Sequence, residues 1–443
     1  MLHQALFILL YLGLLPTVLV SPFAGVLVYH WLDYLPPNDV YAATVVPDNI
    51  SFITGALTFL VWMMREPKAL PRPVWIVLLM GLLLLWINFT WQYALVPDAG
   101  EFFWIRTIKV IGFAILTTLM LSSRARLEAF VWTFVLAVAY YAVPSAIKVL
   151  VSGGSGGIGT GEVVAADAGF FGDRVILSVV MAMALPYVLY LRTHNVFVPS
   201  KWLRIYRLVM VGVFGALLLA SIGTFARTAV FATGAALVMI LLRSRRKVVT
   251  GVLVAAAVIG TLYVAPENWF ERMTTITEYQ NDDSAMSRIT TWKWAWAMTL
   301  EHPIVGGGFG VFTLNAGSIQ GRVGWNEAHN IFFEMMAEHG FVGLVLFCLL
   351  ILVSYRSCGT VQRRTRHDLG LYWIGDLARA TQVALVAFVA GGCFVSIASN
   401  PFLYLLAGVA AGTRSLMERE LFIPRISANS LPVVEGSTVP RTA

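Results

Sequence analysis

Long runs of apolar residues, each about the length of a membrane-spanning helix, follow one another along most of the chain. A helix needs roughly 20 apolar residues to cross the hydrocarbon core of a bilayer. Because the runs lack the period-2 alternation of a transmembrane β-strand, we expect α-helices. The first run is either one kinked span or two short ones. About twelve spans are predicted, at residues 3–34, 48–64, 74–92, 102–121, 127–149, 171–191, 205–222, 227–242, 248–264, 329–355, 376–397 and 401–414.

Composition agrees with this pattern. Of 443 residues, 58% are hydrophobic and 12% are charged, with a mean hydropathy of +0.76. That leaves too little polar surface to cover a water-soluble globule of this size. The three cysteines lie in or beside apolar runs and show no metal-ligand spacing. The chain is therefore predicted to be an all-α polytopic membrane protein.

Basic residues gather in alternate connections between the predicted spans. By the positive-inside rule these connections face the cytoplasm, and the connections poor in Lys and Arg face the exterior. The basic connections hold Arg65, Lys68 and Arg72; Arg124 and Arg126; Arg192, Lys201, Arg204 and Arg207; Arg243, Arg245, Arg246 and Lys247; and Arg356, Arg363, Arg364 and Arg366.

This layout divides the chain into four parts. Residues 1–264 would form an N-terminal transmembrane bundle, and residues 329–416 the C-terminal transmembrane helices. Between them, residues 265–328 form one large exterior loop that is too rich in aromatic residues to be a flexible tether. Residues 417–443 are polar and without periodicity, and are expected to be a disordered cytoplasmic tail.

The large exterior loop contains a predicted helix of its own. In SAMSRITTWKWAWAMTL, Trp292 and Trp296 are four residues apart, which places them on one helical face. Tryptophan favours the membrane interface, so we expect an amphipathic helix lying there. Pro303 and the glycines from 306 to 308 would end it.

Several basic residues lie at the exterior ends of spans, where the positive-inside rule makes them uncommon. Arg174, Arg227 and Arg288 are placed this way, and Arg106 and Lys109 lie in the outer half of a span. A guanidinium matches phosphate oxygens, so three that converge would hold a diphosphate without a metal. The alternative is that each arginine pairs with a nearby acid or reaches lipid headgroups.

The stretch WNEAHNIFFEMMAEHGFVG places ionisable residues at the start of a predicted span. Histidine titrates near neutral pH, so His329 has the chemistry of a general base toward a sugar hydroxyl. A histidine at a helix start is also a common capping or interface residue, and both readings stay open at this point. Gly154, Gly156 and Gly159 formally match the nucleotide motif G-x-G-x-x-G, but they lie in a low-complexity exterior loop with no strand before them. The sequence has no D-x-D pair or H-E-x-x-H motif, so we expect no metal, no cofactor and no nucleic-acid partner.

His329 and Asn330 are followed by nine residues and then by Gly340 and Gly343. This pattern resembles the H-N-x9-G-x-x-G signature of the superfamily of O-antigen ligases and polymerases. The preceding stretch, from ENWFERM through SAMSRITTW to GGGFGVF, resembles ligases of that superfamily near the exosortase-associated O-glycosylation ligases. The likeness covers about residues 165 to 355, and the layout of spans fits the rest.

The resemblance implies a fold like the C-type glycosyltransferases and a metal-independent, inverting transfer at the periplasmic face of the bacterial inner membrane. The donor would be an O-polysaccharide on undecaprenyl diphosphate, and the acceptor a hydroxyl of the lipid A-core oligosaccharide; the other partners would be membrane lipids. His329 matches the family's essential histidine, and Arg288 and Arg227 match its diphosphate-binding arginines. Arg174 is a further candidate. Asn330, Glu338 and His339 would support the site.

Other functions remain possible at this point. Within the superfamily, a polymerase or a protein O-oligosaccharyltransferase would differ only in the acceptor. A lipid-linked glycan transporter would use Arg106, Lys109 and Arg174 to pass an anionic lipid. The chain shows no internal repeat or paired broken helices, which disfavours the transporter.

Overall fold

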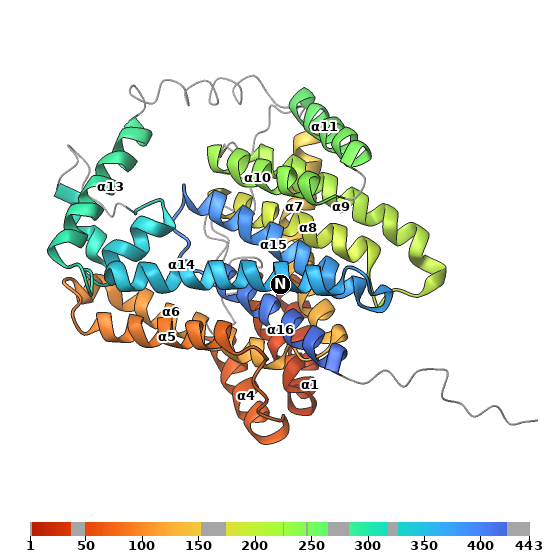
Figure 1. The fold of residues 1–443 in the computed structure, drawn as a ribbon, viewed down its shortest axis with the longest axis horizontal. Helices are drawn as coiled ribbons and strands as arrows, with labels where there is room; N and C mark the ends of the chain where they lie inside the picture. The colour runs from red at the N-terminus through yellow and green to blue at the C-terminus, as the bar shows by residue number, and fades with distance from the viewer. Residues whose placement is uncertain are drawn as a thin grey trace, which may run out of the picture.

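The computed structural model describes residues 2–36, 49–151, 174–224, 226–244, 247–264, 283–317 and 327–422, and its regular elements in these ranges are all helices. Figure 1 shows their arrangement. The α-helices are α1 (Leu2–Val20), α2 (Pro22–Tyr34), α4 (Ile50–Arg65), α5 (Trp75–Trp91), α6 (Pro97–Met120), α7 (Arg124–Val151), α8 (Arg174–Thr193), α9 (Leu203–Gly223), α10 (Arg227–Arg243), α11 (Lys247–Val264), α13 (Asp283–Glu301), α14 (Ile331–Thr365), α15 (Tyr372–Gly392) and α16 (Phe402–Phe422). Three short 3-10 helices accompany them: η2 (Ser200–Trp202), η4 (Val311–Gly317) and η5 (Leu369–Leu371).

Every predicted apolar run contains an α-helix. The first run holds two helices, α1 and α2, which meet at Ser21, and Pro22 then occupies the first turn of α2. Among the described residues, six helices are long and apolar enough to cross a membrane, and three shorter ones are also apolar. The protein is therefore a polytopic membrane protein with an all-helical fold, while the number of twelve spans stays a prediction. The predicted helix of the exterior loop is α13, which ends before Pro303.

Helix α14 runs through the middle of the molecule (Figure 1). It packs against α5, α15 and α16, and α15 in turn packs against α8 and α10. In α16 every residue from Phe402 to Thr413 is buried. Helix α13 lies beside the beginning of α14, at the end of the molecule opposite to the end of α14. The segment around His329 is therefore placed where α13 meets the central helices.

Two helices continue well past the C-terminal ends of their predicted apolar runs. Helix α14 continues past 355 to Thr365, so Arg356 and Arg363 lie on its last turns and not in a connection. Basic side chains at a helix C-terminus favour this extension because they complement the partial negative charge there. Helix α16 continues to Phe422, past the predicted boundary at 416, and Met417 is buried. The rest of the predicted tail, 423–443, lies outside the described residues.

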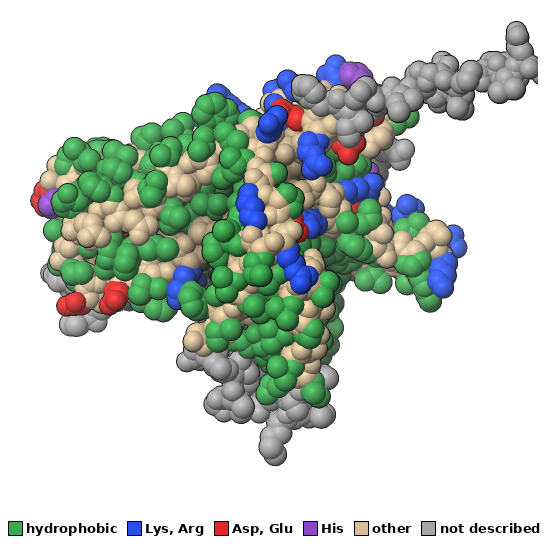
Figure 2. Space-filling model, turned by 90° about the horizontal axis from the view of Figure 1, so that it is seen from below, with side chains coloured by type: hydrophobic (Ala, Val, Ile, Leu, Met, Phe, Trp, Pro, Cys, Tyr) green, Lys and Arg blue, Asp and Glu red, His purple; other side chains and the backbone are tan. Residues whose placement is uncertain are grey.

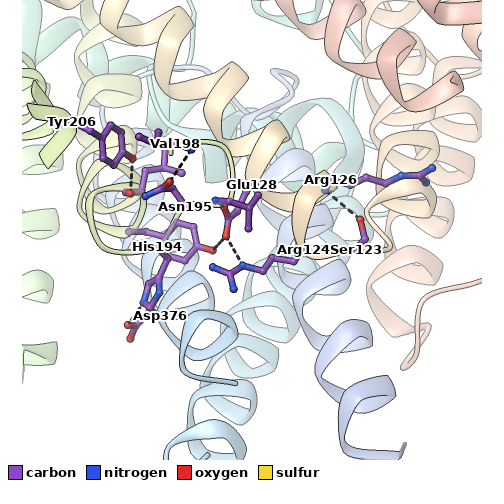
Figure 3. A network of polar contacts seen from close by, with 12 residues as sticks. Ser123, Arg124, Arg126, Glu128, His194, Asn195, Val198, Tyr206 and Asp376 are labelled. Carbon is purple, nitrogen blue, oxygen red and sulfur yellow. Dashed lines mark hydrogen bonds and ion pairs between the residues drawn. The ribbon is translucent and has the colours of Figure 1, made fainter. Parts of the chain in front are cut away.

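A buried carboxylate ties α7 to α8 at the end predicted to face the cytoplasm (Figure 3). Glu128 is fully buried and accepts hydrogen bonds from Nε of Arg124 (2.8 Å) and from the hydroxyl of Tyr190 (3.1 Å). It also accepts one from the main-chain N–H of Val196, at 2.8 Å. Three donors offset the cost of removing this charge from water.

The surface reflects the membrane setting. Figure 2 shows wide apolar areas, with Lys and Arg side chains gathered mostly in the right-hand half of the visible face. That is the side on which α14 ends in Figure 1. This distribution agrees with the basic connections lying at one end of the bundle.

Candidate active site at the start of α14

His329 lies in the turn that leads into α14, two residues before the helix begins. Its φ is 47°, in the left-handed region that residues other than glycine seldom adopt and that is frequent at functional sites. Its main-chain N–H donates a hydrogen bond of 2.9 Å to Oγ of Ser396. The side chain is 41% exposed, with Nδ1 4.0 Å from Oε2 of Glu327. The main chain at His329 is thus anchored, while its imidazole is accessible to solvent.

Asn330 connects the start of α14 to the end of α15. Its side-chain oxygen accepts hydrogen bonds from the N–H groups of Phe332 (2.9 Å) and Phe333 (3.3 Å), which caps the helix. Its amide nitrogen donates to the carbonyl of Cys393 at 3.0 Å. The predicted supporting residue therefore fixes the backbone directly after His329.

The connection between α15 and α16, residues 393–401, forms one wall of the site. Besides Ser396 and Cys393, it contributes the N–H of Ala398, which donates to Oε2 of the buried Glu334 at 3.1 Å. The sequence predicts a shorter connection, between spans at 376–397 and 401–414, and so places Cys393 and Ser396 inside a span. The run of Ser, Asn and Pro in SIASNP signals a turn, but it does not indicate which other segment the turn contacts.

Helix α13 reaches the same place through Trp292. The indole N–H of Trp292 donates to the carbonyl of Ala328 at 2.7 Å, and its ring stacks on Phe333 with centroids 5.4 Å apart. Arg288 precedes Trp292 by four residues, so both lie on the same face of α13. The helix therefore presents Arg288 on the face that packs against the residue before His329.

Arg227 is the first residue of α10. One turn later, Phe231 stacks on Phe394 of the α15–α16 connection, with ring centroids 4.5 Å apart. Arg227 and Phe231 are four residues apart on one face of the helix. The first turn of α10 thus lies over the segment that holds His329 and Asn330.

Arg174 is the first residue of α8. Near the same end of α8, Val179 packs against Gly391 so closely that a Cβ at Gly391 would collide with it. The neighbouring Gly392 packs equally closely against Ile331, the first residue of α14. The end of α15 therefore links the N-terminal part of α8 to the start of α14.

The remaining basic residues of interest lie on α6. The ammonium group of Lys109 is 4.9 Å from the centroid of the Phe52 ring on α4. Arg106 is close enough to Asp33 of α2 to interact with it electrostatically. Both cations are thus engaged with neighbouring helices of the N-terminal bundle.

Gly340 breaks α14 between its first part and the long remainder. Its φ is 69° and its ψ is −174°, so the helical hydrogen-bond ladder is interrupted there. The glycine-rich turn after α13 fills the break: the N–H groups of Gly307 and Gly308 donate to the carbonyls of Ala337 (2.8 Å) and Glu338 (2.9 Å). The N–H of Phe341 donates to the carbonyl of Pro303 at 2.9 Å. The first glycine of the signature therefore docks the loop onto α14.

Glu338 and His339 lie at this break and are both buried. The carbonyl of His339 accepts a hydrogen bond from the indole of Trp86 at 2.9 Å. Its Nδ1 shares a hydrogen bond of 2.8 Å with the hydroxyl of Thr90, and Phe309 packs edge-on against its ring. These contacts give His339 a structural part in joining α5 to α14.

Comparison with known families gives two matches. Residues 211–348 match the O-antigen ligase family. Residues 2–196 match a family of unknown function, DUF5935. A comparison with curated proteins gives no match. The first match shows that residues 211–348 are similar to O-antigen ligases, a family of glycan-transferring enzymes that use lipid-linked glycans.

The ligase-family segment contains Arg227, Arg288, His329 and the two signature glycines. Arg174 lies outside it, within the other match. The α15–α16 connection also lies outside the ligase-family segment, although it supplies the hydrogen-bond partners of His329 and Asn330. The site is therefore assembled partly from residues that the family match does not cover.

Proposed function

We propose that the protein is an O-antigen ligase of the bacterial inner membrane. It transfers O-polysaccharide from undecaprenyl diphosphate to a hydroxyl of the lipid A-core oligosaccharide at the periplasmic face. The observation that carries this proposal is that the ligase-family segment contains His329 in a left-handed, anchored and solvent-accessible conformation at the start of α14.

In the proposed reaction, the imidazole of His329 takes the proton of the acceptor hydroxyl. The hydroxyl oxygen forms a bond to the anomeric carbon while the bond from that carbon to the diphosphate oxygen breaks. The diphosphate leaves with the undecaprenyl chain, and attack from the opposite face inverts the anomeric configuration. Proton abstraction by a positioned base is expected to contribute about 10²- to 10⁴-fold to the rate.

Arg288, Arg227 and Arg174 would bind the diphosphate and compensate its charge as it leaves. Their placement supports this role, because α13 contacts Ala328 and α10 contacts the connection that holds His329 and Asn330. Helix α8 contacts the end of α15, which leads into the same connection. Helices α10 and α8 also begin at their arginines, so the positive ends of two helix dipoles accompany the guanidinium groups. We therefore expect transfer to proceed in the presence of a metal chelator.

The test uses the purified full-length protein with undecaprenyl-diphosphate-linked O-polysaccharide and rough lipopolysaccharide, in chelator. The decisive variant is His329→Asn, because asparagine adopts the left-handed region more readily than most residues and so retains the backbone. His302→Asn, after the end of α13, is the matched control. Capped lipopolysaccharide should form with the wild type and with His302→Asn. The rate of its formation should be at least about 100-fold lower with His329→Asn.

The products separate the proposal from its alternatives. Longer lipid-linked chains without capped lipopolysaccharide would indicate a polymerase. Glycan attached to a Ser or Thr of an added protein would indicate a protein O-oligosaccharyltransferase. Movement of the donor across a vesicle membrane, without transfer to any acceptor, would replace the enzyme with a transporter.

A further inference from the structure

A second polar site lies at the opposite end of α14, where the sequence predicts the cytoplasmic face. A cavity of about 620 Å³ opens between α10, α14 and α15. This volume is within the range typical of ligand pockets. The ligase signature is at the other end of the same helix, so the proposed transfer does not use this cavity.

The cavity is strongly basic. Its described lining includes Arg243, Arg356, Arg363 and Arg366 and contains no Asp or Glu. Within the described part of the chain, Arg243 donates to neutral groups there, the side-chain oxygen of Gln362 at 3.4 Å and the hydroxyl of Tyr355 at 3.2 Å. Four guanidinium groups around one cavity repel one another unless an anion is bound between them.

The charged lining continues into an apolar stripe along α14. Leu349 and Leu352 are exposed, at 39% and 41%, and Arg356 follows one turn after Leu352. The spacing of three or four residues continues to Arg363 and places all of these side chains on one face of the helix. A molecule with a phosphate at one end and a hydrocarbon chain at the other would match this face.

Not every arginine at this end of α14 faces the cavity, and Arg364 is the exception. Its guanidinium lies 3.8 Å from a carboxylate oxygen of Glu418 on α16. Arg364 does not line the cavity, although it is next to Arg363 in the same helical turn. The arginines of this helix end therefore divide into one with a carboxylate partner and three that line the cavity.

We propose that the cavity binds the phosphate of an anionic phospholipid of the cytoplasmic leaflet, with the acyl chains lying along Leu352 and Leu349. Basic pockets between transmembrane helices at this face recognise such headgroups. Arginine binds phosphate oxygens through paired N–H donors, and Gln382 and Tyr355 provide further polar contacts at the cavity wall. The lipid would tie α10 to α14 and α15 at the end of the bundle away from the transfer site.

Native mass spectrometry of the purified full-length protein tests the proposal. Cardiolipin, phosphatidylethanolamine and sodium pyrophosphate are added separately to the protein in neutral detergent. The wild type should retain cardiolipin in preference to phosphatidylethanolamine, and added salt should weaken this binding. The double variant Arg356→Gln/Arg363→Gln should bind cardiolipin about tenfold or more weakly. The control Arg364→Gln, which removes an equivalent charge outside the cavity, should change binding less than about twofold.

A second variant tests the cavity without changing its charge. A Cβ at Gly359 would lie 3.4 Å from Nε2 of Gln382 and 3.7 Å from a guanidinium nitrogen of Arg363. Gly359→Leu would therefore place its branched end in the cavity and should also weaken cardiolipin binding. Size-exclusion chromatography and far-UV circular dichroism check folding of each variant.

Two results would overturn the proposal. One is equal uptake of cardiolipin by the wild type, the double variant and Gly359→Leu. The other is binding of pyrophosphate that depends on the arginines, without any preference for cardiolipin, which would make the ligand a soluble phosphate compound. Neither readout involves glycan transfer, so the result is independent of the proposed function.

Discussion

The hydroxyl of Ser396 accepts a hydrogen bond from the main-chain N–H of His329 at 2.9 Å and so joins the α15–α16 connection to the turn before α14. Asn330 makes a second link to the same connection through the carbonyl of Cys393. The left-handed conformation of His329 is therefore held from a segment more than sixty positions later in the chain. This relationship suggests that Ser396 positions the proposed catalytic base.

Replacing Ser396 with alanine is expected to lower the rate of glycan transfer about fivefold, because one hydrogen bond contributes roughly 1 kcal/mol. The loss should appear in kcat, with little change in KM for the donor, since the substitution affects the position of the base. Ser396→Thr keeps the hydroxyl and should restore most of the rate. Equal loss in both variants would show that the hydroxyl has no positioning role.

Arg288→Lys tests the binding of the diphosphate. Lysine keeps the charge but loses the paired donors, so kcat/KM for the donor should fall about ten- to a hundredfold. Lys293→Gln, an exposed position on the same helix, is the control and should leave kcat/KM unchanged. Initial rates measured over a range of donor concentrations, at a fixed acceptor concentration, give kcat/KM for each variant. A larger effect from Lys293→Gln than from Arg288→Lys would refute the assigned role.

Gly340→Ala is expected to destabilise the protein by more than about 2 kcal/mol. The residue has a positive φ, and a Cβ there would collide with the carbonyl group of Ile304. The glycine-rich turn would then lose its place on α14. Gly81→Ala, where a Cβ meets nothing within 4 Å, should be neutral or slightly stabilising because alanine favours a helix. Thermal unfolding in detergent measures both variants, and similar melting temperatures would contradict the role given to the break.

Glu128→Ala is expected to destabilise the protein by about 3–5 kcal/mol, because it removes a buried carboxylate and leaves three donors without their acceptor. Glu418→Ala is the comparison, since Glu418 is partly exposed and pairs with Arg414 and with the exposed Arg364. That change should cost about 1 kcal/mol or less. Chemical unfolding followed by tryptophan fluorescence would distinguish them. A comparable loss in the two variants would show that burial of Glu128 is unimportant.

Much of the fold follows from local properties of the sequence. Each apolar run contains a helix because a segment of this length, placed in lipid, must satisfy its backbone hydrogen bonds internally. A different local signal, the four-residue spacing of Trp292 and Trp296, predicted α13, and Pro303 predicted its end. The predicted runs for α14 and α16 stop before the helices do, because hydropathy detects only apolar residues. Both helices continue through polar and basic residues and still bury side chains such as Cys358 and Met417.

The sequence also singled out His329, Asn330 and Gly340 through their spacing, although it did not reveal how the three act together. The structure shows that Asn330 caps α14 and that Gly340 receives the turn after α13. The parts of the exterior loop at 265–282 and 318–326 lie outside the described residues, so the predicted structure of those parts stays a prediction.

The sequence by itself determined that this is a helical membrane protein, where its apolar segments lie and which residues carry the ligase-like signature. Hydropathy and spacing are properties of neighbouring residues, so they can be read along the chain. Only the tertiary structure decided that Ser396 anchors His329, that Trp292 reaches Ala328 and that four arginines surround one cavity. These contacts depend on how separate helices pack side by side, and that packing is set by the fit of many side chains across the whole bundle.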